Sequence, residues 1–175
     1  YLLLGYQEGL NLRQLIREQG PQSENRVIEI AISLIQPLNH LHSLSPPVVH
    51  RDISPENIIL KEDDTAVLID FGAANEYLGT ATGTMVGKQC YVSPEQFKGK
   101  ASTESDLYSL GATLYYLLTG SDPTPISVSS PKEVRPEISE KLDSIIQRLT
   151  ALEIEDRITT AHELEELLVA LRLLR

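Results

Sequence analysis

Three side chains in the middle of the chain have the chemistry of a divalent-cation site beside a proton acceptor. Asp52 and Asn57 lie in one short segment, and Asp70 follows Asn57 by thirteen positions at the end of an apolar run. Mg²⁺ in proteins takes hard oxygen ligands such as carboxylates and carbonyls, and a carboxylate can also accept a hydroxyl proton. The alternative interpretation is that Asp52 and Asn57 only shape a turn.

The motifs around these side chains resemble, in their order, the signature of the protein kinases. They read His50-Arg51-Asp52-Ile53-Ser54-Pro55-Glu56-Asn57, then Asp70-Phe71-Gly72, then Ser93-Pro94-Glu95. Kinases carry His-Arg-Asp with a later Asn, then Asp-Phe-Gly, then Ala-Pro-Glu, so only Ser93 departs from these letters. Each motif alone is weakly specific, but the ordered set at this spacing is a strong signal.

The resemblance implies a protein serine/threonine kinase that uses ATP with Mg²⁺ (or Mn²⁺) and phosphorylates a protein substrate. Phosphoryl transfer depends on positioning and charge neutralisation more than on covalent catalysis. Asp52 would be the base that receives the substrate's hydroxyl proton, and Asn57 and Asp70 would hold the metal ion. The residues between Asp52 and Asn57 resemble the serine/threonine form rather than the tyrosine form, and Glu56 among them could face a basic substrate side chain.

The resemblance covers nearly the whole chain and implies further roles. Six residues would line the nucleotide site, at the hinge, at the ribose contact and at the floor and rear of the pocket. They are Leu4, Gly5, Gln7, Asn11, Ile59 and Ile69. The residues that would have structural roles are His50, Phe71, Asp106, Glu95 and Arg157. Within that group, Asp106 would hold the backbone of residues 50–57, called the catalytic segment below, and Glu95 would pair with Arg157.

Two neighbouring departures from the family pattern suggest an exchange of roles. Ser54 stands where serine/threonine kinases usually have Lys, and Lys88 stands where they usually have a Thr that contacts the base. We hypothesise that Lys88 reaches Asp52 and restores the missing ammonium group, while Ser54 supplies the missing hydroxyl. The alternative is that Lys88 is an exposed loop residue. This combination resembles the serine/threonine kinases of cyanobacteria.

Two residues are candidates for regulation. In the family, an Arg that precedes the catalytic base binds an activation-loop phosphate, and Arg51 has this position. A phosphorylated side chain carries about −1.5 to −2 charges at neutral pH. Thr84 lies where the family's main phosphorylation site falls, eleven residues before Glu95. The alternative is that Thr84 is an ordinary loop residue.

Periodicity and breakers predict the elements that position these residues. We expect a strand over 1–6, a strand-like run at 48–49, and a hairpin over 58–60 and 66–69. We expect helices over 12–18 (capped by Asn11), about 23–44, 105–119 (central and buried), 138–152 and 160–173. An irregular stretch is expected over 71–93 and a loop over 123–136. The fold class is therefore α+β and protein-kinase-like, a mainly helical large lobe with a small hairpin sheet.

The family's small lobe is missing from this sequence except for its last strand and the hinge. No Gly-rich phosphate loop, no Val-Ala-Ile-Lys strand and no helix with the partner Glu precede residue 9. We therefore expect a partial kinase domain, with residues 1–8 from the small lobe and 9–175 forming the large lobe. The missing N-terminal lobe is then a required partner, and this chain is expected to be inactive by itself. The alternative function is a non-catalytic scaffold or pseudokinase lobe that binds proteins.

Bulk composition excludes several other classes of protein. The chain has 41% hydrophobic and 23% charged residues, which is ordinary for a globular domain. Its net charge of −10 argues against nucleic-acid binding and leaves room for a basic peptide partner. The single cysteine, Cys90, allows neither an intrachain disulfide nor a cysteine-based metal site. No apolar run is long enough for a membrane segment, so we expect a cytoplasmic location.

Overall fold

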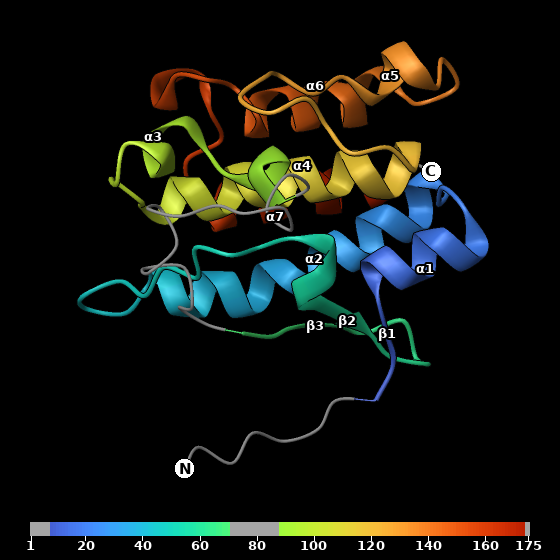
Figure 1. Cartoon of the computed structure of the whole chain (residues 1–175), viewed down its shortest axis with the longest axis horizontal. Coiled ribbons are helices and arrows are strands. Elements are labelled where there is room, and N and C mark those ends of the chain that lie inside the picture. Colours follow the sequence, from blue (N-terminus) through green and yellow to red (C-terminus); the bar gives the residue numbers. More distant parts are fainter. Residues whose placement is uncertain (1–7, 71–87, 174–175) are drawn as a thin grey trace.

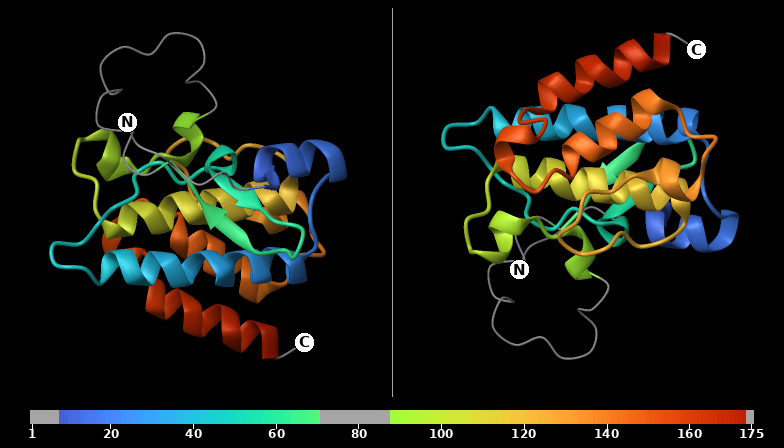
Figure 2. Two further views of the ribbon diagram at one scale, coloured as in Figure 1. Left: turned by 90° about the horizontal axis from the view of Figure 1, so that it is seen from below. Right: turned by 90° about the horizontal axis from the view of Figure 1, so that it is seen from above.

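A long buried helix, α4 (Thr103–Thr119), lies in the middle of a stack of helices (Figure 1). The computed structural model describes residues 8–70 and 88–173 of the 175. Helix α4 packs between α2 (Glu24–His42) and α6 (Glu140–Leu149), and α7 (Ala161–Leu173) covers the outer side of α2 (Figure 2). Fourteen of the 17 residues of α4 are buried, so the prediction of a central buried helix is confirmed.

The contact between α4 and α6 depends on a glycine. A Cβ atom at Gly111 would lie 2.5 Å from Cβ of Leu149 and 3.1 Å from Cγ2 of Thr150. Only a residue without a side chain allows the two helix backbones to approach this closely. The position of α6, and of the chain that follows it, therefore depends on Gly111.

Both helices before the catalytic segment begin with a side-chain cap, and the first of these caps was predicted. Asn11 caps α1 (Leu12–Gln19), and Ser23 caps α2 through its side chain. Helix α2 ends at His42, two residues before the predicted end near Leu44. The reason is that the following chain folds back, so that Val48 N donates to Leu41 O at 3.0 Å. The apolar pair at 48–49 forms no strand, and that prediction was wrong.

The small sheet has three antiparallel strands in the order β1-β2-β3 and lies under α1 and α2 in Figure 1. The strands are β1 (Leu10–Asn11), β2 (Ile58–Leu60) and β3 (Ala66–Leu68). The hairpin of β2 and β3 was predicted, whereas β1 is too short to show an alternating pattern. The sheet buries Ile58, Leu60, Ala66 and Leu68 on one face.

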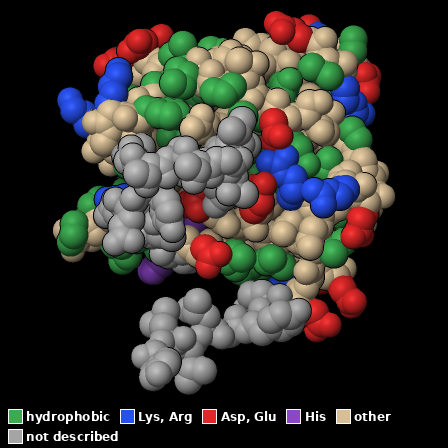
Figure 3. Space-filling view, in the orientation of Figure 1, with side chains coloured by type: hydrophobic (Ala, Val, Ile, Leu, Met, Phe, Trp, Pro, Cys, Tyr) green, Lys and Arg blue, Asp and Glu red, His purple; other side chains and the backbone are tan. Residues whose placement is uncertain are grey.

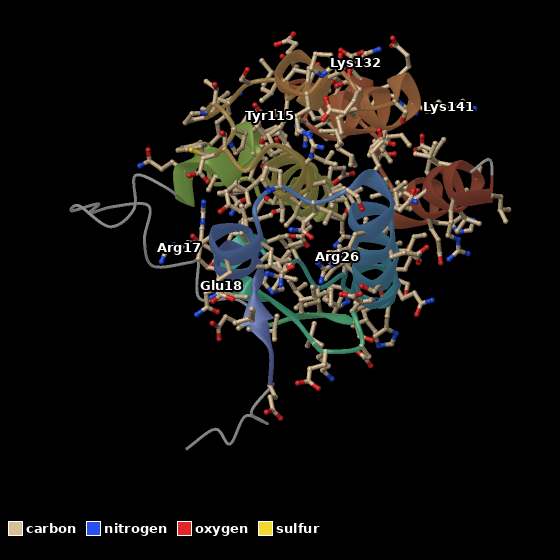
Figure 4. The ribbon with its side chains drawn as sticks, turned by 90° about the vertical axis from the view of Figure 1, so that its right-hand side faces the viewer. Arg17, Glu18, Arg26, Tyr115, Lys132 and Lys141 are labelled. Carbon is tan, nitrogen blue, oxygen red and sulfur yellow. The ribbon has the colours of Figure 1, made fainter. Side chains whose placement is uncertain are left out.

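The turn of this hairpin is fixed to the helices by Arg26. Its Nη2 atom lies 2.8 Å from Asp64 Oδ1, and its Nη1 atom donates to the side chains of Gln19 and Gln22. Figure 4 shows Arg26 on α2, on the side that faces the end of α1. The contacts place the hairpin, and the catalytic segment before it, in a fixed position under α2.

Elsewhere the helix boundaries differ from the predicted ones. The predicted loop 123–136 contains a short helix, α5 (Pro131–Val134), and Pro94–Phe97 forms another, α3. Helix α6 is shorter than predicted because Ser139 caps its first turn and the chain leaves the helix at Thr150. Short 3-10 turns occupy Pro55–Asn57, Lys88–Tyr91 and Ile154–Asp156.

The predicted strand 1–6 and most of the predicted irregular stretch 71–93 lie outside the described residues. Within the described ranges, no helix is both long enough and apolar enough to span a bilayer.

Candidate active site

The amide of Asn57 holds the carboxylate of Asp52. Asn57 Nδ2 donates to Asp52 Oδ2 at 2.7 Å and to the backbone oxygen of Asp52 at 2.8 Å. The 3-10 turn Pro55–Asn57 brings the two residues together, with Pro55 fixing the first position of the turn. Asn57 is buried, so the orientation of the Asp52 carboxylate is set by the fold.

A second carboxylate, that of Asp106 in α4, holds the backbone just before Asp52. Its Oδ2 accepts from His50 N and its Oδ1 from Arg51 N, both at 2.9 Å. His42 Nε2 also lies 2.9 Å from Oδ2. Asp106 is 1% exposed, and a buried carboxylate needs such donors because water cannot reach it. The structure therefore brings together Asp106 and the catalytic segment.

His50 links this segment to the strand that leads to Asp70. Asp52 N donates to His50 Nδ1 at 3.3 Å, so His50 Nε2 carries the proton and donates to Ile69 O at 3.0 Å. Burial lowers the pKa of His50 below its usual 6.5, although the nearby Asp106 carboxylate and Ile69 carbonyl oppose the shift. His50 is thus neutral at pH 7 and acts as a two-way hydrogen-bonding link.

Arg51 and Asp70 both have left-handed backbone conformations, with φ of 71° and 61°. Such conformations cost residues other than glycine roughly 1–3 kcal/mol and persist where neighbouring contacts hold them, often at functional sites. Here the Asp106 carboxylate holds Arg51 N, and Ile69 N donates to Asn57 O at 2.9 Å, directly before Asp70. The second contact puts Asp70 next to Asn57.

Asn57 and Asp70 together suit a hard divalent cation. Because Asn57 Nδ2 faces Asp52, its Oδ1 is the atom that can bind a metal ion, and Asp70 is exposed. Mg²⁺ is commonly held by one or two protein oxygens together with substrate phosphates. No group of three or more His, Cys, Asp or Glu side chains that could hold a metal forms in 8–70 or 88–173. The two oxygens of Asn57 and Asp70 fit a cation that is shared with a phosphate ligand.

One face of the sheet offers a half-buried apolar surface beside these oxygens. Asn11 and Ile59 are register partners, and Ile59 also pairs with Val67. Because side chains alternate along a strand, Ile69 lies on the same side as Val67. Sequence reasoning chose Asn11, Ile59 and Ile69 but missed Val67, which the alternation could have found.

Asn11 has a second role that limits its freedom. Its Oδ1 accepts from Gln14 N at 2.8 Å, and Gln14 Oε1 accepts from Asn11 N at 3.0 Å. This capping box fixes the direction of Oδ1 and leaves the Nδ2 group of Asn11 for another partner.

The expected contact between Ser54 and Asp52 is not formed. Ser54 is 1% exposed, and its Oγ atom has no hydrogen-bond partner among the residues described. The physical reason is that Asn57 already holds Asp52 Oδ2, while Ser54 points into the interior. Lys88 begins the turn Lys88–Tyr91, but its side chain lies outside what the structure describes, so its contact with Asp52 stays a hypothesis.

Comparisons with known proteins fit this geometry. The protein kinase domain family matches residues 1–169. The chain belongs to the protein kinase family. It is 37% identical to the serine/threonine-protein kinase PknA of Nostoc sp. (strain PCC 7120), over 96% of this chain and 32% of that protein. It is 33% identical to PknB of Mycobacterium tuberculosis, over 97% of this chain and 30% of that protein.

A solved kinase structure shows the same fold. The kinase domain of Mycobacterium tuberculosis PknI, solved as a point mutant, superposes with a TM-score of 0.73 at 24% identity, over 94% of this chain and 61% of that one. The α+β, protein-kinase-like fold predicted from the sequence is confirmed, as is the resemblance to serine/threonine kinases that include a cyanobacterial member. The chain spans about a third of the length of the curated relatives it matches.

The kinase fold also contains the buried ion pair expected between Glu95 and Arg157. Arg157 Nη1 lies 2.8 Å from Glu95 Oε1 and Nη2 3.1 Å from Oε2, with Ser105 Oγ donating to the same carboxylate at 2.7 Å. Burial would raise the pKa of Glu95, but the hydrogen bonds from Arg157 and Ser105 outweigh it and lower the pKa to about 2. The pair ties α3 to α4 and the chain beyond α6.

Gln96, which sequence reasoning missed, connects α3 to the catalytic segment. Its Nε2 donates to Arg51 O at 2.6 Å. Asp106 and Gln96 thus hold the two sides of the Arg51 residue. A polar side chain directly after the Ser-Pro-Glu motif was the only sequence signal.

Five of the predicted site residues lie outside the described residues, namely Leu4, Gly5, Gln7, Phe71 and Thr84.

Proposed function

We propose that the full-length protein transfers the γ-phosphoryl group of ATP to serine or threonine hydroxyls of a protein substrate, with this chain as a partial kinase domain whose residues 9–175 are the large lobe. The observation that carries the proposal is the joint placement of Asp52, Asn57 and Asp70. The side chain of Asn57 holds Asp52, and its carbonyl accepts from the residue before Asp70. A scaffold has no need of that arrangement.

In this mechanism Asp52 accepts the proton of the substrate hydroxyl. The hydroxyl oxygen then forms a bond to the terminal phosphorus of ATP as the bond to the departing ADP oxygen breaks. Asn57 Oδ1 and Asp70 would hold Mg²⁺ or Mn²⁺, which supplies positive charge against the phosphate oxygens. The half-buried face of Ile59, Val67 and Ile69 would support the nucleotide base.

Ser54 stands where serine/threonine kinases usually have a Lys, and we propose that Lys88 supplies the missing ammonium group. Residues 88–91 precede α3, which contacts the catalytic segment through Gln96, and the flexible stem of a lysine suits such a reach. A crystal structure with a bound nucleotide tests the idea. Lys88 Nζ within about 4 Å of the Asp52 carboxylate supports it, and a Lys88 side chain turned into solvent contradicts it.

The experiment for the function itself is phosphopeptide mass spectrometry. The full-length protein is incubated with ATP, Mg²⁺ and a generic protein substrate, with and without excess EDTA. We expect phosphoserine or phosphothreonine only in the sample without EDTA, because the metal ion is required. Phosphotyrosine alone would contradict the specificity, and the absence of any phosphate transfer would favour the scaffold function.

A further inference from the structure

A guanidinium group from α1 fills an acidic position beside the catalytic segment. Arg13 Nε lies 2.8 Å from Glu56 Oε1, and Nη1 lies 2.7 Å from Asp122 Oδ1. Nη2 donates to the hydroxyl of Tyr91 at 3.3 Å, and this hydroxyl donates to Asp122 Oδ1 at 2.5 Å. One cation of the protein therefore pairs with two carboxylates from distant parts of the chain.

Arg13 is held there by aromatic rings as well as by charge. Its guanidinium carbon lies 4.3 Å from the ring centre of Tyr116 and 5.7 Å from that of Tyr91. The side chain of Arg13 is 18% exposed. Burial would lower the pKa of Arg13, but Asp122, Tyr91 and Glu56 together raise it. The cation is therefore a fixed part of this site, unlike an ordinary surface arginine.

The position of the cluster relative to Asp52 suits contact with the residues that flank a phosphorylated hydroxyl. Glu56 directly precedes Asn57, whose side chain contacts Asp52, and Tyr91 ends the turn just before the Ser-Pro-Glu motif. An extended peptide advances about 3.3 Å per residue, so side chains two or three residues from the hydroxyl lie about 7–10 Å away. Consecutive Cα atoms are about 3.8 Å apart, so the backbone of Glu56 lies one residue from Asn57, which contacts Asp52.

The two carboxylates are also open to a ligand. The side chains of Glu56 and Asp122 are 35% and 41% exposed, respectively. Oε2 of Glu56, by contrast, is buried and has no hydrogen-bond partner among the residues that the structure describes, so a ligand would approach the exposed part of this side chain. Figure 3 shows acidic and basic side chains next to one another near the centre of this face.

We propose that Arg13 is a specificity-determining residue. Its guanidinium group occupies an acidic position that would otherwise select an Arg or Lys side chain of the substrate near the phosphorylated residue. This inference rests on the proposed function. With Arg13 in place, a basic substrate side chain gains little there, since Arg13 already occupies an oxygen of each carboxylate and repels a second cation. Without it, a substrate guanidinium would form charge-assisted hydrogen bonds to both, each worth about ten-fold or more in binding.

The test compares full-length wild type with Arg13→Met, which keeps the apolar stem over Tyr116 but removes the charge. Both are assayed on peptides that carry either Arg or Gln at each position from four before to four after the target residue. We expect wild type to be indifferent, and the variant to favour Arg at one position by about 10- to 100-fold in kcat/KM. The matched control is Arg17→Met, since Arg17 projects outward from the same helix (Figure 4) and should change nothing.

Two results would overturn the inference. One is an unchanged preference in a folded Arg13→Met variant, and the other is a wild type that already selects Arg through Glu56. Should Arg13→Met fail to fold, Arg13→Gln also removes the charge but keeps a polar side chain. A shift toward Arg in that variant supports the proposal, and no shift contradicts it.

A binding measurement separates this inference from the proposed function. Calorimetry measures the binding of the Arg and Gln peptides to the Asp52→Asn protein and to the double variant that also carries Arg13→Met. This measurement does not depend on phosphate transfer. Selective tightening of the Arg peptide by Arg13→Met supports the role of Arg13 even where catalysis is absent. Equal affinities alongside active phosphate transfer would contradict that role while leaving the function intact.

Discussion

Replacing Arg157 with methionine should strongly destabilise the protein. The Arg157 side chain is fully buried and bonds both oxygens of Glu95. It also donates to the carbonyls of Glu104, Ala151 and Leu152 at 3.2, 3.0 and 3.3 Å. Methionine would leave the Glu95 charge buried without its partner, which typically costs about 3–5 kcal/mol.

Urea and thermal unfolding followed by circular dichroism measure this loss. In a domain of this size each kcal/mol lowers Tm by roughly 2–4 °C, so we expect a fall of about 6–20 °C. The matched control is Arg148→Met, since Arg148 lies 2.7 Å from Glu163 on the exposed surface and should cost no more than about 1 kcal/mol. Equal losses in the two variants would refute the assignment of Glu95 and Arg157 as a structural pair.

Three further predictions follow from other sites. The pKa of Glu95 is depressed, so its carboxylate contributes stability at pH values above its usual pKa of 4.5, and this contribution is lost as the pH falls towards about 2. The difference in unfolding free energy between wild type and Glu95→Gln, measured by urea unfolding, should therefore disappear between those two pH values. A difference that stays constant would contradict this prediction. Gly111→Ala should destabilise by about 1–3 kcal/mol through its clash with Leu149, whereas a gain, as helix propensity alone predicts, would count against the close contact. Mass spectrometry of the active protein after incubation with ATP should find phosphate on Thr84, and an unmodified Thr84 would argue against its regulatory role.

The sequence predicted best where the pattern was long or the motif dense. Helix α4 has apolar residues nearly all round, so its burial was predictable, and the ordered motifs led to Asp52, Asn57 and Asp70. Asn11 was a predictable cap because its side chain satisfies a free amide of the first helical turn. Long-range partners such as Asp106 and Arg157 entered only through the family resemblance.

What the sequence did not predict depends on contacts between distant residues. Strand β1 has two residues and exists because Leu10 and Asn11 pair with β2. The end of α2 is set by the returning chain at Val48, which no local propensity encodes. Arg13 showed no local sign of its role, because its partners Glu56, Tyr91 and Asp122 are 43 to 109 positions away.

The most direct test of the account is the initial rate of phosphate transfer from ATP to a protein substrate by the full-length protein and its Asp52→Asn variant. A general base contributes about 10²- to 10⁴-fold to such rates, so the variant should lose at least about 100-fold while Asp156→Asn, at an exposed surface position, stays near wild type. An Asp52→Asn variant with the wild-type rate would contradict the assignment of Asp52 as the catalytic base.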